Sequence, residues 1–377
     1  MSARIADSHA GATGMITIDL GVLASNWRAL AARVAPARCG AVVKADAYGL
    51  GAARVIPALA RAGCDVFFIA TPEEATLARR LAPTSTIYAL DGLAGAADHF
   101  AHLGVCPVLS TFDELEAWAS RAHALGRRLP AAVHIDTGLN RLGLPMRDCR
   151  RLAADGQPLS RVDLALVMSH LASADNPRDP KNRDQLVAFE TLSALFPGVP
   201  RSLAASDGLM LGTDYHFDLV RPGYALYGGQ ASETILAPVK PVVTVTVRIL
   251  AVADIAPGET VGYSATWRAK RSSRIATIAA GYADGVPRSA SAPDGRPGGQ
   301  VMIAGALAPI VGRVSMDLVT VDVTDAPAGA VRANDFATLI GPGLSIEDAG
   351  YSAGTIGYEI LTRLGRRFER VYVGEAS

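Results

Sequence analysis

The segment AVVKADAYGLGA at residues 41–52 places an ammonium group where an apolar strand is expected to end. Burying a charged amine is costly, so Lys44 is either a surface lysine that happens to follow a strand or a residue that performs chemistry. A buried lysine close to another cation has a lowered pKa, and its neutral amine is a nucleophile toward carbonyl groups. Lys44 is therefore a candidate for covalent chemistry with a carbonyl compound.

Other polar side chains also stand at or just after the ends of apolar segments: Asp136, Arg141, His170, Ser206 and Arg221. Taken singly, each has an ordinary structural explanation, such as a hydrogen-bonded histidine or an arginine in an ion pair. Together with a lysine they suit pyridoxal phosphate, which needs a lysine for its aldehyde, hydroxyl and N–H groups for its phosphate, and a polar partner for its ring nitrogen. Ser206 and Gly223 suit the phosphate.

These side chains can meet only if the fold gathers the ends of several strands at one edge. The first two-thirds of the chain alternates short apolar segments with amphipathic ones at helical spacing, which indicates parallel strands joined by crossover helices. Eight strands are expected, at residues 40–44, 65–70, 86–90, 106–110, 131–136, 163–170, 201–206 and 218–223. Eight strands close a (β/α)8 barrel, whose catalytic groups gather at the carboxyl ends of the strands. An open doubly wound sheet is the structural alternative.

The pattern of the sequence changes after Pro238. The segment VVTVTVRILAV alternates with period two, and similar segments follow, separated by Gly/Pro turns, at residues 274–282, 318–325, 335–341 and 367–373. We therefore predict a cofactor-binding barrel over residues 1–238 and a β-rich domain over residues 239–377.

Composition limits the classes of function. Of the 377 residues, 50% are hydrophobic, and 36 basic residues balance 36 acidic ones, so no charge excess favours nucleic acid or an anionic membrane. No apolar run is long enough to span a bilayer, and the N-terminus lacks the apolar stretch of a secretion signal. The cysteines stand singly, which predicts no metal site and reduced thiols in a cytoplasmic protein: Cys39, Cys64, Cys106 and Cys149.

The glycine-rich segment GLGAAR at residues 49–54 follows a strand and opens a helix, as a dinucleotide fingerprint does. Arg54 occupies the position where that fingerprint needs a small residue for close helix–strand packing. A Rossmann oxidoreductase therefore remains only a minor alternative.

Eight ordered blocks resemble alanine racemases, which are fold-type III pyridoxal-phosphate enzymes: VVKADAYGLGA (42–52), DTGLNRLG (136–143), SHLASAD (169–175), RPGYALYG (221–228), VGYSATW (261–267), GYADGVPR (281–288), GRVSMD (312–317) and GYEILTR (357–363). The resemblance covers nearly the whole chain. It implies a TIM-like barrel followed by a β domain, pyridoxal 5'-phosphate as cofactor, and interconversion of L- and D-alanine that supplies D-alanine for peptidoglycan.

The resemblance also implies roles for individual residues. Lys44 would bond to the cofactor, and Lys44 and Tyr263 would be the two bases. The cofactor would be held by Tyr48, His170, Ser206, Arg221, Gly223, Tyr224 and Tyr358, with Arg221 at the pyridine nitrogen. The substrate carboxylate would meet Arg141 and Met316, and the entry channel would be narrowed by Asp175, Tyr282 and Arg288. In the family Tyr263 and Met316 reach the site of the opposite subunit, so a homodimer is implied.

Two positions depart from the family pattern. Where many members carry a carbamylated lysine before DTG, this chain has His134, so it is open whether another group, such as a bound anion, orients Arg141. Where an asparagine often precedes the phosphate serine, this chain has Ala205. Neither change touches the acid–base pair.

Three functions stay open at this stage. A racemase would act on alanine, or on serine, which differs by one hydroxyl that apolar pockets reject poorly. A fold-type III decarboxylase should carry an acidic residue at the ring nitrogen, against which Arg221 argues. A non-catalytic cofactor-binding barrel would lack the second domain that supplies Tyr263.

From spacing alone Tyr263 resembles a core tyrosine with a hydrogen-bonded hydroxyl, and only the VGYSATW block assigns it as a base.

Overall fold

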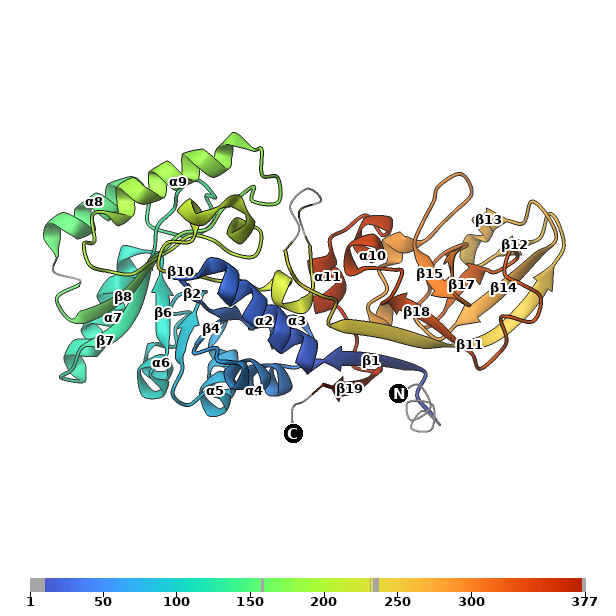
Figure 1. Ribbon diagram of the computed structural model, residues 1–377, viewed down its shortest axis with the longest axis horizontal. Helices are drawn as coiled ribbons and strands as arrows, with labels where there is room; N and C mark the ends of the chain where they lie inside the picture. The colour runs from blue at the N-terminus through green and yellow to red at the C-terminus, as the bar shows by residue number, and fades with distance from the viewer. Residues whose placement is uncertain (1–10, 157–158, 231, 233–236, 375–377) are drawn as a thin grey trace. The chain divides into compact units, whose positions relative to one another are not determined.

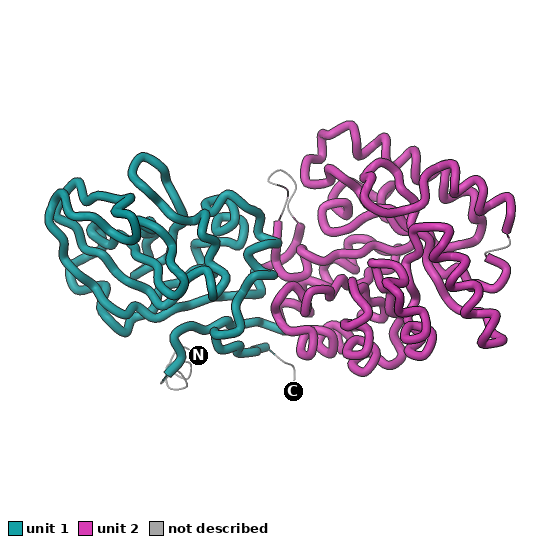
Figure 2. The backbone as a smooth tube through the Cα atoms, turned by 180° about the vertical axis from the view of Figure 1, so that it is seen from behind, with its two compact units in different colours: residues 1–20, 241–377 teal, residues 21–240 magenta. Residues whose placement is uncertain are grey.

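The computed structural model describes residues 11–156, 159–230, 232 and 237–374 (Figure 1). The chain forms two compact units, one of residues 21–240 and one of residues 1–20 together with 241–377 (Figure 2). The predicted division gave all of residues 1–238 to the barrel. Residues 11–20 group instead with the β-rich unit, because β1 (Gly14–Asp19) pairs with β11 (Val243–Ile255) and β19 (Glu369–Val373) of that unit.

The unit of residues 21–240 is built on parallel strands. Seven of them form one sheet, in chain order β3 (Ala41–Val42), β4 (Val66–Ile69), β5 (Thr86–Ala89), β6 (Cys106–Leu109), β7 (Leu129–His134), β8 (Val162–Met168) and β9 (Arg201–Ser202). A second parallel pair consists of β2 (Arg38–Cys39) and β10 (Leu219–Val220). The β4 and β6 strands are buried along their whole length, as expected for a parallel sheet covered on both faces.

The β10 strand closes these strands into a barrel. On one side the Arg221 N–H donates to the Ala204 carbonyl at 3.0 Å, next to β9. On the other side the Val42 N–H donates to the Pro222 carbonyl at 2.9 Å, and β10 pairs with β2, which only Gly40 separates from β3. All eight expected strands are present, and the barrel rather than the open sheet is confirmed.

Helix α2 (Leu20–Val34) precedes the first barrel strand, and helices connect the strands that follow: α3 (Lys44–Tyr48), α4 (Ala52–Ala62), α5 (Pro72–Leu81), α6 (Ala97–Leu103), α7 (Phe112–Ala124), α8 (Met146–Asp155) and α9 (Pro180–Ser193). Their starts follow the usual capping chemistry. The Thr111 hydroxyl accepts the Glu114 N–H at 3.2 Å before α7, and the Asp179 carboxylate accepts the Lys181 N–H at 2.9 Å before α9. Three 3-10 turns follow β9, at Gly208–Leu211, Thr213–Tyr215 and Tyr224–Tyr227.

The other unit is mostly β, as predicted. Its sheet is centred on the long strand β11, which alternates buried and partly buried residues over its first half. The remaining strands are β12 (Thr260–Val261), β13 (Trp267–Arg268), β14 (Ser273–Ile278), β15 (Gln300–Ile303), β16 (Ala306–Pro309), β17 (Val319–Asp322) and β18 (Phe336–Ile340). Two short helices that the sequence did not predict, α10 (Ile346–Ser352) and α11 (Gly357–Thr362), pack beside each other. Over the described ranges, no helix has both the length and the apolar character needed to cross a membrane.

Candidate active site

Lys44 stands two residues after the end of β3 and is the first residue of α3, rather than the last residue of the strand. Its side chain is partly buried. Burial is the largest cause that lowers the pKa of this lysine, and the neighbouring cations Arg141 and Arg221 lower it further. Asp91 and Glu74 act in the opposite direction. A lysine in this setting loses its proton more readily than an exposed one, as covalent chemistry with a carbonyl requires.

The chain after Lys44 adopts a left-handed turn. The four residues Ala45 to Tyr48 have φ values between 53° and 57°, a region that residues with a Cβ rarely occupy. Each such residue costs roughly 1–2 kcal/mol relative to the right-handed form, so the surroundings must hold the turn in place. At its far end the Ala52 N–H donates to Asp46 Oδ1 at 2.7 Å. The turn brings the ring of Tyr48 into the protein, where it is buried.

Tyr48, Ser206 and Gly223 meet at the carboxyl edge of the barrel. The buried Ser206 hydroxyl accepts the N–H groups of Gly223 and Ala225 at 3.0 and 3.1 Å. A Cβ added to Gly223 would lie 2.3 Å from the Tyr48 hydroxyl oxygen, so only glycine leaves room for this contact. Tyr224, the next residue, is also buried. The structure therefore brings together a serine, a glycine and two tyrosines that the sequence suggested for a phosphate group.

Arg221 is almost fully buried behind this edge. Its guanidinium donates to the Ser202 hydroxyl at 2.6 Å and to the Ser169 carbonyl at 2.7 Å, and its Nη2 lies 3.3 Å from His170 Nδ1. Burial lowers the pKa of Arg221 to about 9, which still leaves it charged at neutral pH. Burial, followed by the charge of Arg221, lowers the pKa of His170 to about 3. The imidazole is therefore neutral, and its Nδ1 can accept a hydrogen bond from the guanidinium.

His134 ends β7, where the family pattern often has a lysine. Its side chain is buried, and burial lowers its pKa to about 4, so the neutral ring supplies no charge to pair with Arg141. The loop that leads to Arg141 is held from its start, because Asp136 Oδ1 accepts the N–H groups of Gly138 and Asn140 at 2.9 and 3.1 Å. Arg141 itself is exposed, and no hydrogen bond or ion pair of its side chain is found within the described part of the chain.

The buried neutral His134 predicts that stability falls in acid. The unfolded chain binds a proton at this residue below a pKa of about 6.5, whereas the folded chain does so only near pH 4. His134 therefore does not lower the free energy of unfolding above pH 6.5. As the pH falls from 6.5 toward 4, it lowers the free energy of unfolding by up to about 1.4 kcal/mol per pH unit. We expect the thermal midpoint of His134→Gln to fall less steeply than that of the natural protein between pH 7 and pH 4.5. If the thermal midpoints of the two proteins fall equally steeply with pH, this expectation is contradicted.

Tyr263 belongs to the β-rich unit and lies in a 3-10 turn, Tyr263–Ala265, after β12. Its side chain is 71% exposed, so it is not the core tyrosine that spacing alone suggested. The turn is attached to the neighbouring loop, because Arg313 Nη1 donates to the Ser264 hydroxyl at 3.0 Å. Tyr263 is thus presented at the surface of its unit with its backbone held.

Tyr282 and Met316 lie on two adjacent loops of the same unit. The N–H groups of Tyr282 and Ala283 donate to the carbonyls of Ser315 and Met316 at 3.0 and 3.1 Å. The side chains of Tyr282 and Met316 are 40% and 53% exposed. Large apolar side chains held at a surface in this way are suited to contact another molecule.

An ion network holds these two loops together. Arg367 donates twice to the buried carboxylate of Asp284, at 2.7 Å each, and once to Asp317 at 2.6 Å. Asp284 also accepts the Gly281 N–H at 3.0 Å, beside Tyr282. Asp317 therefore supports the loop next to Met316. The pairing of Arg367 with Asp284 could not be predicted from the sequence, since an arginine and an aspartate 83 residues apart give no local signal.

Removing the positive charge of this network should destabilise the β-rich unit. In Arg367→Met the carboxylate of Asp284 stays buried without its ionic partner, which is costly. We expect a clear fall in the thermal midpoint. Arg363→Met is the matched control, because Arg363 forms an ion pair with the exposed Glu359 at 2.6 Å, and such pairs contribute little. Equal midpoints for the two variants would contradict the prediction.

The remaining predicted residues are located as follows. Asp175 is exposed in the loop after β8, in the same unit as Lys44. Arg288 is exposed at the start of a 3-10 turn, Arg288–Ala290, and Tyr358 is partly buried in α11, both in the β-rich unit. The structure thus gathers Lys44, Tyr48, His170, Ser206, Arg221, Gly223 and Tyr224 at one edge of the barrel. The roles of the residues of the β-rich unit toward Lys44 stay predictions.

Comparison with known families decides the classification. The model of the alanine racemase N-terminal domain matches residues 18–231, and that of the alanine racemase C-terminal domain matches residues 242–372. The chain belongs to the alanine racemase family. The resemblance of the eight sequence blocks and the predicted fold class are thereby confirmed.

Individual members of the family are similar over almost the whole chain. The alanine racemase of Methylobacterium sp. (strain 4-46) is 49% identical over 359 residues, which cover 95% of this chain and 97% of that one. The crystal structure of alanine racemase from Bartonella henselae with covalently bound pyridoxal phosphate is 38% identical, has a TM-score of 0.91, and covers 96% of this chain and all of that one. The biosynthetic alanine racemase of Pseudomonas aeruginosa gives a TM-score of 0.89 at 33% identity, over 96% of this chain and 100% of that one.

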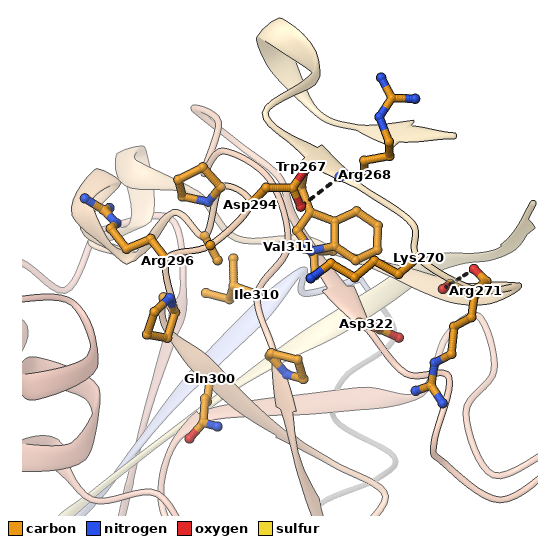
Figure 3. Close-up of a pocket in the computed structure, with 17 residues that line it drawn as sticks. Trp267, Arg268, Lys270, Arg271, Asp294, Arg296, Gln300, Ile310, Val311 and Asp322 are labelled. Atoms are coloured by element: carbon orange, nitrogen blue, oxygen red, sulfur yellow. Dashed lines mark hydrogen bonds between the residues drawn. The ribbon is translucent and has the colours of Figure 1, made fainter. Parts of the chain in front are cut away.

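The β-rich unit of this chain contains a cavity of about 660 Å³ (Figure 3). Trp267 and Lys270 contribute to its wall, whereas the side chains of Arg268 and Arg271 extend away from Trp267. Arg271 is paired with Asp325 outside the cavity at 2.6 Å. None of the predicted site residues lines this cavity, so it is not the candidate active site.

Proposed function

We propose that this protein interconverts L- and D-alanine with pyridoxal 5'-phosphate bound at Lys44, and that the D-alanine serves peptidoglycan synthesis. One observation carries the proposal. A partly buried lysine with a lowered pKa stands at the carboxyl edge of the barrel, beside the Ser206–Gly223 contact and the buried Arg221. The relative from Bartonella henselae is described with this cofactor covalently bound, which supports the choice of cofactor.

The residues at this edge fit the cofactor. Because Gly223 has no side chain, the Tyr48 hydroxyl lies close to its backbone, next to the Ser206 hydroxyl, and hydroxyl groups placed in this way suit a phosphate group. Tyr48, Ser206, Gly223 and Tyr224 would hold the phosphate, with Tyr358 of the β-rich unit as a further contact. Arg221 would face the ring nitrogen, supported by His170, and Lys44 would bond to the aldehyde.

Inversion at Cα requires that a proton leaves one face of the carbon and returns to the other. Two bases on opposite faces achieve this without a large movement, and we assign them to Lys44 Nζ and Tyr263 Oη. General acid–base groups of this kind typically contribute on the order of 10²–10⁴-fold each. When bound, the cofactor supplies an electron sink that stabilises the charge left on Cα. Arg141 and the backbone near Met316 would hold the substrate carboxylate.

Arg221 distinguishes a racemase from a decarboxylase. A guanidinium with a pKa of about 9 keeps its proton at neutral pH, so it donates a hydrogen bond without transferring the proton to a ring nitrogen. A weaker electron sink favours simple return of the proton over transamination. An acidic residue would be expected at this place in a decarboxylase. The buried contacts of Arg221 therefore favour racemisation.

We also propose that the active site is shared between two copies of the chain in a homodimer. The exposure of Tyr263, Tyr282 and Met316 at the surface of their unit supports this arrangement. The four cysteines are free and buried, which agrees with a cytoplasmic location. Asp175, Tyr282 and Arg288 would narrow the entry channel, and a narrow channel favours alanine over longer amino acids.

The experiment that tests the function is circular dichroism of L-alanine in D₂O with purified protein and pyridoxal phosphate. The proposal predicts that the optical signal decays to zero while deuterium enters at Cα. If the cofactor binds and the signal persists, alanine is the wrong substrate or the protein is not a racemase. Serine, lysine and release of CO₂ would then be tested in that order.

Gly223 offers a test of the cofactor site. In Gly223→Ala the new Cβ would lie 2.3 Å from the Tyr48 hydroxyl oxygen and force the ring to move. We expect the affinity for pyridoxal phosphate, measured by absorbance titration of the cofactor-free chain, to fall at least about tenfold, or about 1.4 kcal/mol. Gly11→Ala is the control, because an added Cβ there has no heavy atom within 4 Å. Unchanged affinity for pyridoxal phosphate in Gly223→Ala would show that Gly223 does not belong to the cofactor site.

A further inference from the structure

We propose that Glu74 is a positioning residue for Lys44: its carboxylate fixes the first peptide of the left-handed turn and supplies a negative charge beside the lysine. The catalytic meaning of this role rests on the proposed function, whereas the contacts themselves do not. Glu74 lies in the first turn of α5 and was not singled out from the sequence.

The two oxygens of Glu74 join separate parts of the barrel edge. Oε1 accepts the Ala45 N–H at 2.6 Å, immediately after Lys44, and Oε2 accepts the Ala70 N–H at 2.8 Å, immediately after β4. Glu74 therefore ties the peptide that follows Lys44 to the end of the neighbouring strand. A hydrogen bond to a carboxylate is stronger than one between neutral groups, so this link suits a segment under strain.

The turn after Lys44 needs such a link. Its four residues all carry a Cβ and all have positive φ, a conformation that persists only when contacts outside the turn impose it. Asp46 restrains the far end through the Ala52 N–H, and Glu74 restrains the near end through the Ala45 N–H. Without Glu74 the near end loses its acceptor, and the backbone that carries the Lys44 side chain can relax.

The barrel contains a second copy of this arrangement, away from Lys44. Glu114 in α7 also has a threonine three residues before it, and its oxygens accept the N–H groups of Leu93 and Ser110 at 2.9 and 2.8 Å. Ser110 follows β6 as Ala70 follows β4. The two glutamates therefore share a structural role at a strand–helix junction, and they differ in that only Glu74 contacts the peptide next to Lys44. Glu114 is a matched control for a purely structural effect.

Glu74 also shapes the charge around Lys44. The charged groups that act on the ammonium group are Arg141 and Arg221, which lower its pKa, and Asp91 and Glu74, which raise it. Neutralising Glu74 removes one of the two carboxylates that favour the protonated form. The Lys44 amine should then lose its proton at a lower pH.

The test compares Glu74→Gln with Glu114→Gln in the full-length chain. The first readout is the pH dependence of acetic anhydride labelling at Lys44 in cofactor-free protein, followed by mass spectrometry of the peptide. We expect the midpoint in Glu74→Gln to shift to lower pH by roughly half a unit or more, and that in Glu114→Gln to match the natural protein. The second readout is kinetic, with kcat for alanine reduced roughly tenfold in Glu74→Gln and KM changed much less.

Other outcomes overturn the proposal. If Glu74→Gln labels like the natural protein, or if Glu114→Gln shifts equally, Glu74 has only the structural role. Glu74→Asp keeps the charge on a shorter side chain, so its midpoint should lie closer to the natural value, and it replaces Glu74→Gln if that variant fails to fold. Because labelling requires no catalysis, a shifted midpoint in Glu74→Gln together with no racemisation of alanine by the natural protein would disprove the proposed function and leave the positioning role standing.

Discussion

Replacing Lys44 with alanine is expected to lower kcat for alanine racemisation by at least about 10⁴-fold. Under the proposed function, the variant loses both a base and the amine that holds the cofactor aldehyde. The loss should appear in the dichroism assay with added pyridoxal phosphate. Borohydride reduction of the natural protein should fix the cofactor to the peptide that contains Lys44, and the variant should contain no reduced cofactor at that peptide.

The control is Lys270→Ala, which removes an exposed lysine of the β-rich unit. It should keep its kcat within a factor of about two, since surface substitutions away from a site have small effects. A Lys44→Ala enzyme that retains a tenth of the natural rate would show that another group removes the proton. Cofactor fixed to a different lysine in the natural protein would contradict the assignment directly.

The barrel could be predicted from the sequence because each of its strands is a short apolar run followed by a polar residue or turn. The strand positions followed from that alternation, and the closing contact at Arg221 follows from the number of strands. β1 was missed because its partners lie in β11 and β19, more than two hundred residues away along the chain. α10 was missed although Ser345 and Asp348 form a capping box, a local signal that could have been found.

The candidate site was predictable in its residue types but not in its backbone. Ala45, Asp46, Ala47 and Tyr48 have no common preference for positive φ, so nothing in ADAY predicts a left-handed turn. The turn depends on a carboxylate from α5, which is a tertiary contact. His134 was recognised as a departure from the family pattern. Only the structure shows that the ring is buried and neutral and so does not replace a negative charge beside Arg141.

Replacing Tyr263 with phenylalanine should separate exchange of the α-proton from inversion at Cα. Under the proposed two-base assignment the variant lacks one base, and we expect racemisation to fall by about 10²–10⁴-fold. Lys44 still serves one face of Cα, so one enantiomer of alanine should exchange its α-proton with D₂O without inversion. NMR of each enantiomer in D₂O measures this directly. Tyr351→Phe, at a position that is 85% exposed, is the control and should behave like the natural protein. Equal loss of exchange for both enantiomers would contradict the two-base assignment.

Mixing the two inactive variants decides whether Tyr263 acts on its own chain or on a partner. If the site is shared in a homodimer, a mixed dimer of Lys44→Ala and Tyr263→Phe chains contains one site with both natural bases and one with neither. Random exchange makes half of the dimers mixed, so about one quarter of the natural activity should return. If Tyr263 serves the Lys44 of its own chain, every site in the mixture lacks one base and no activity returns. Neither variant can regain its missing side chain by refolding. Regained activity would therefore require the exposed Tyr263 of one copy to reach Lys44 of the other.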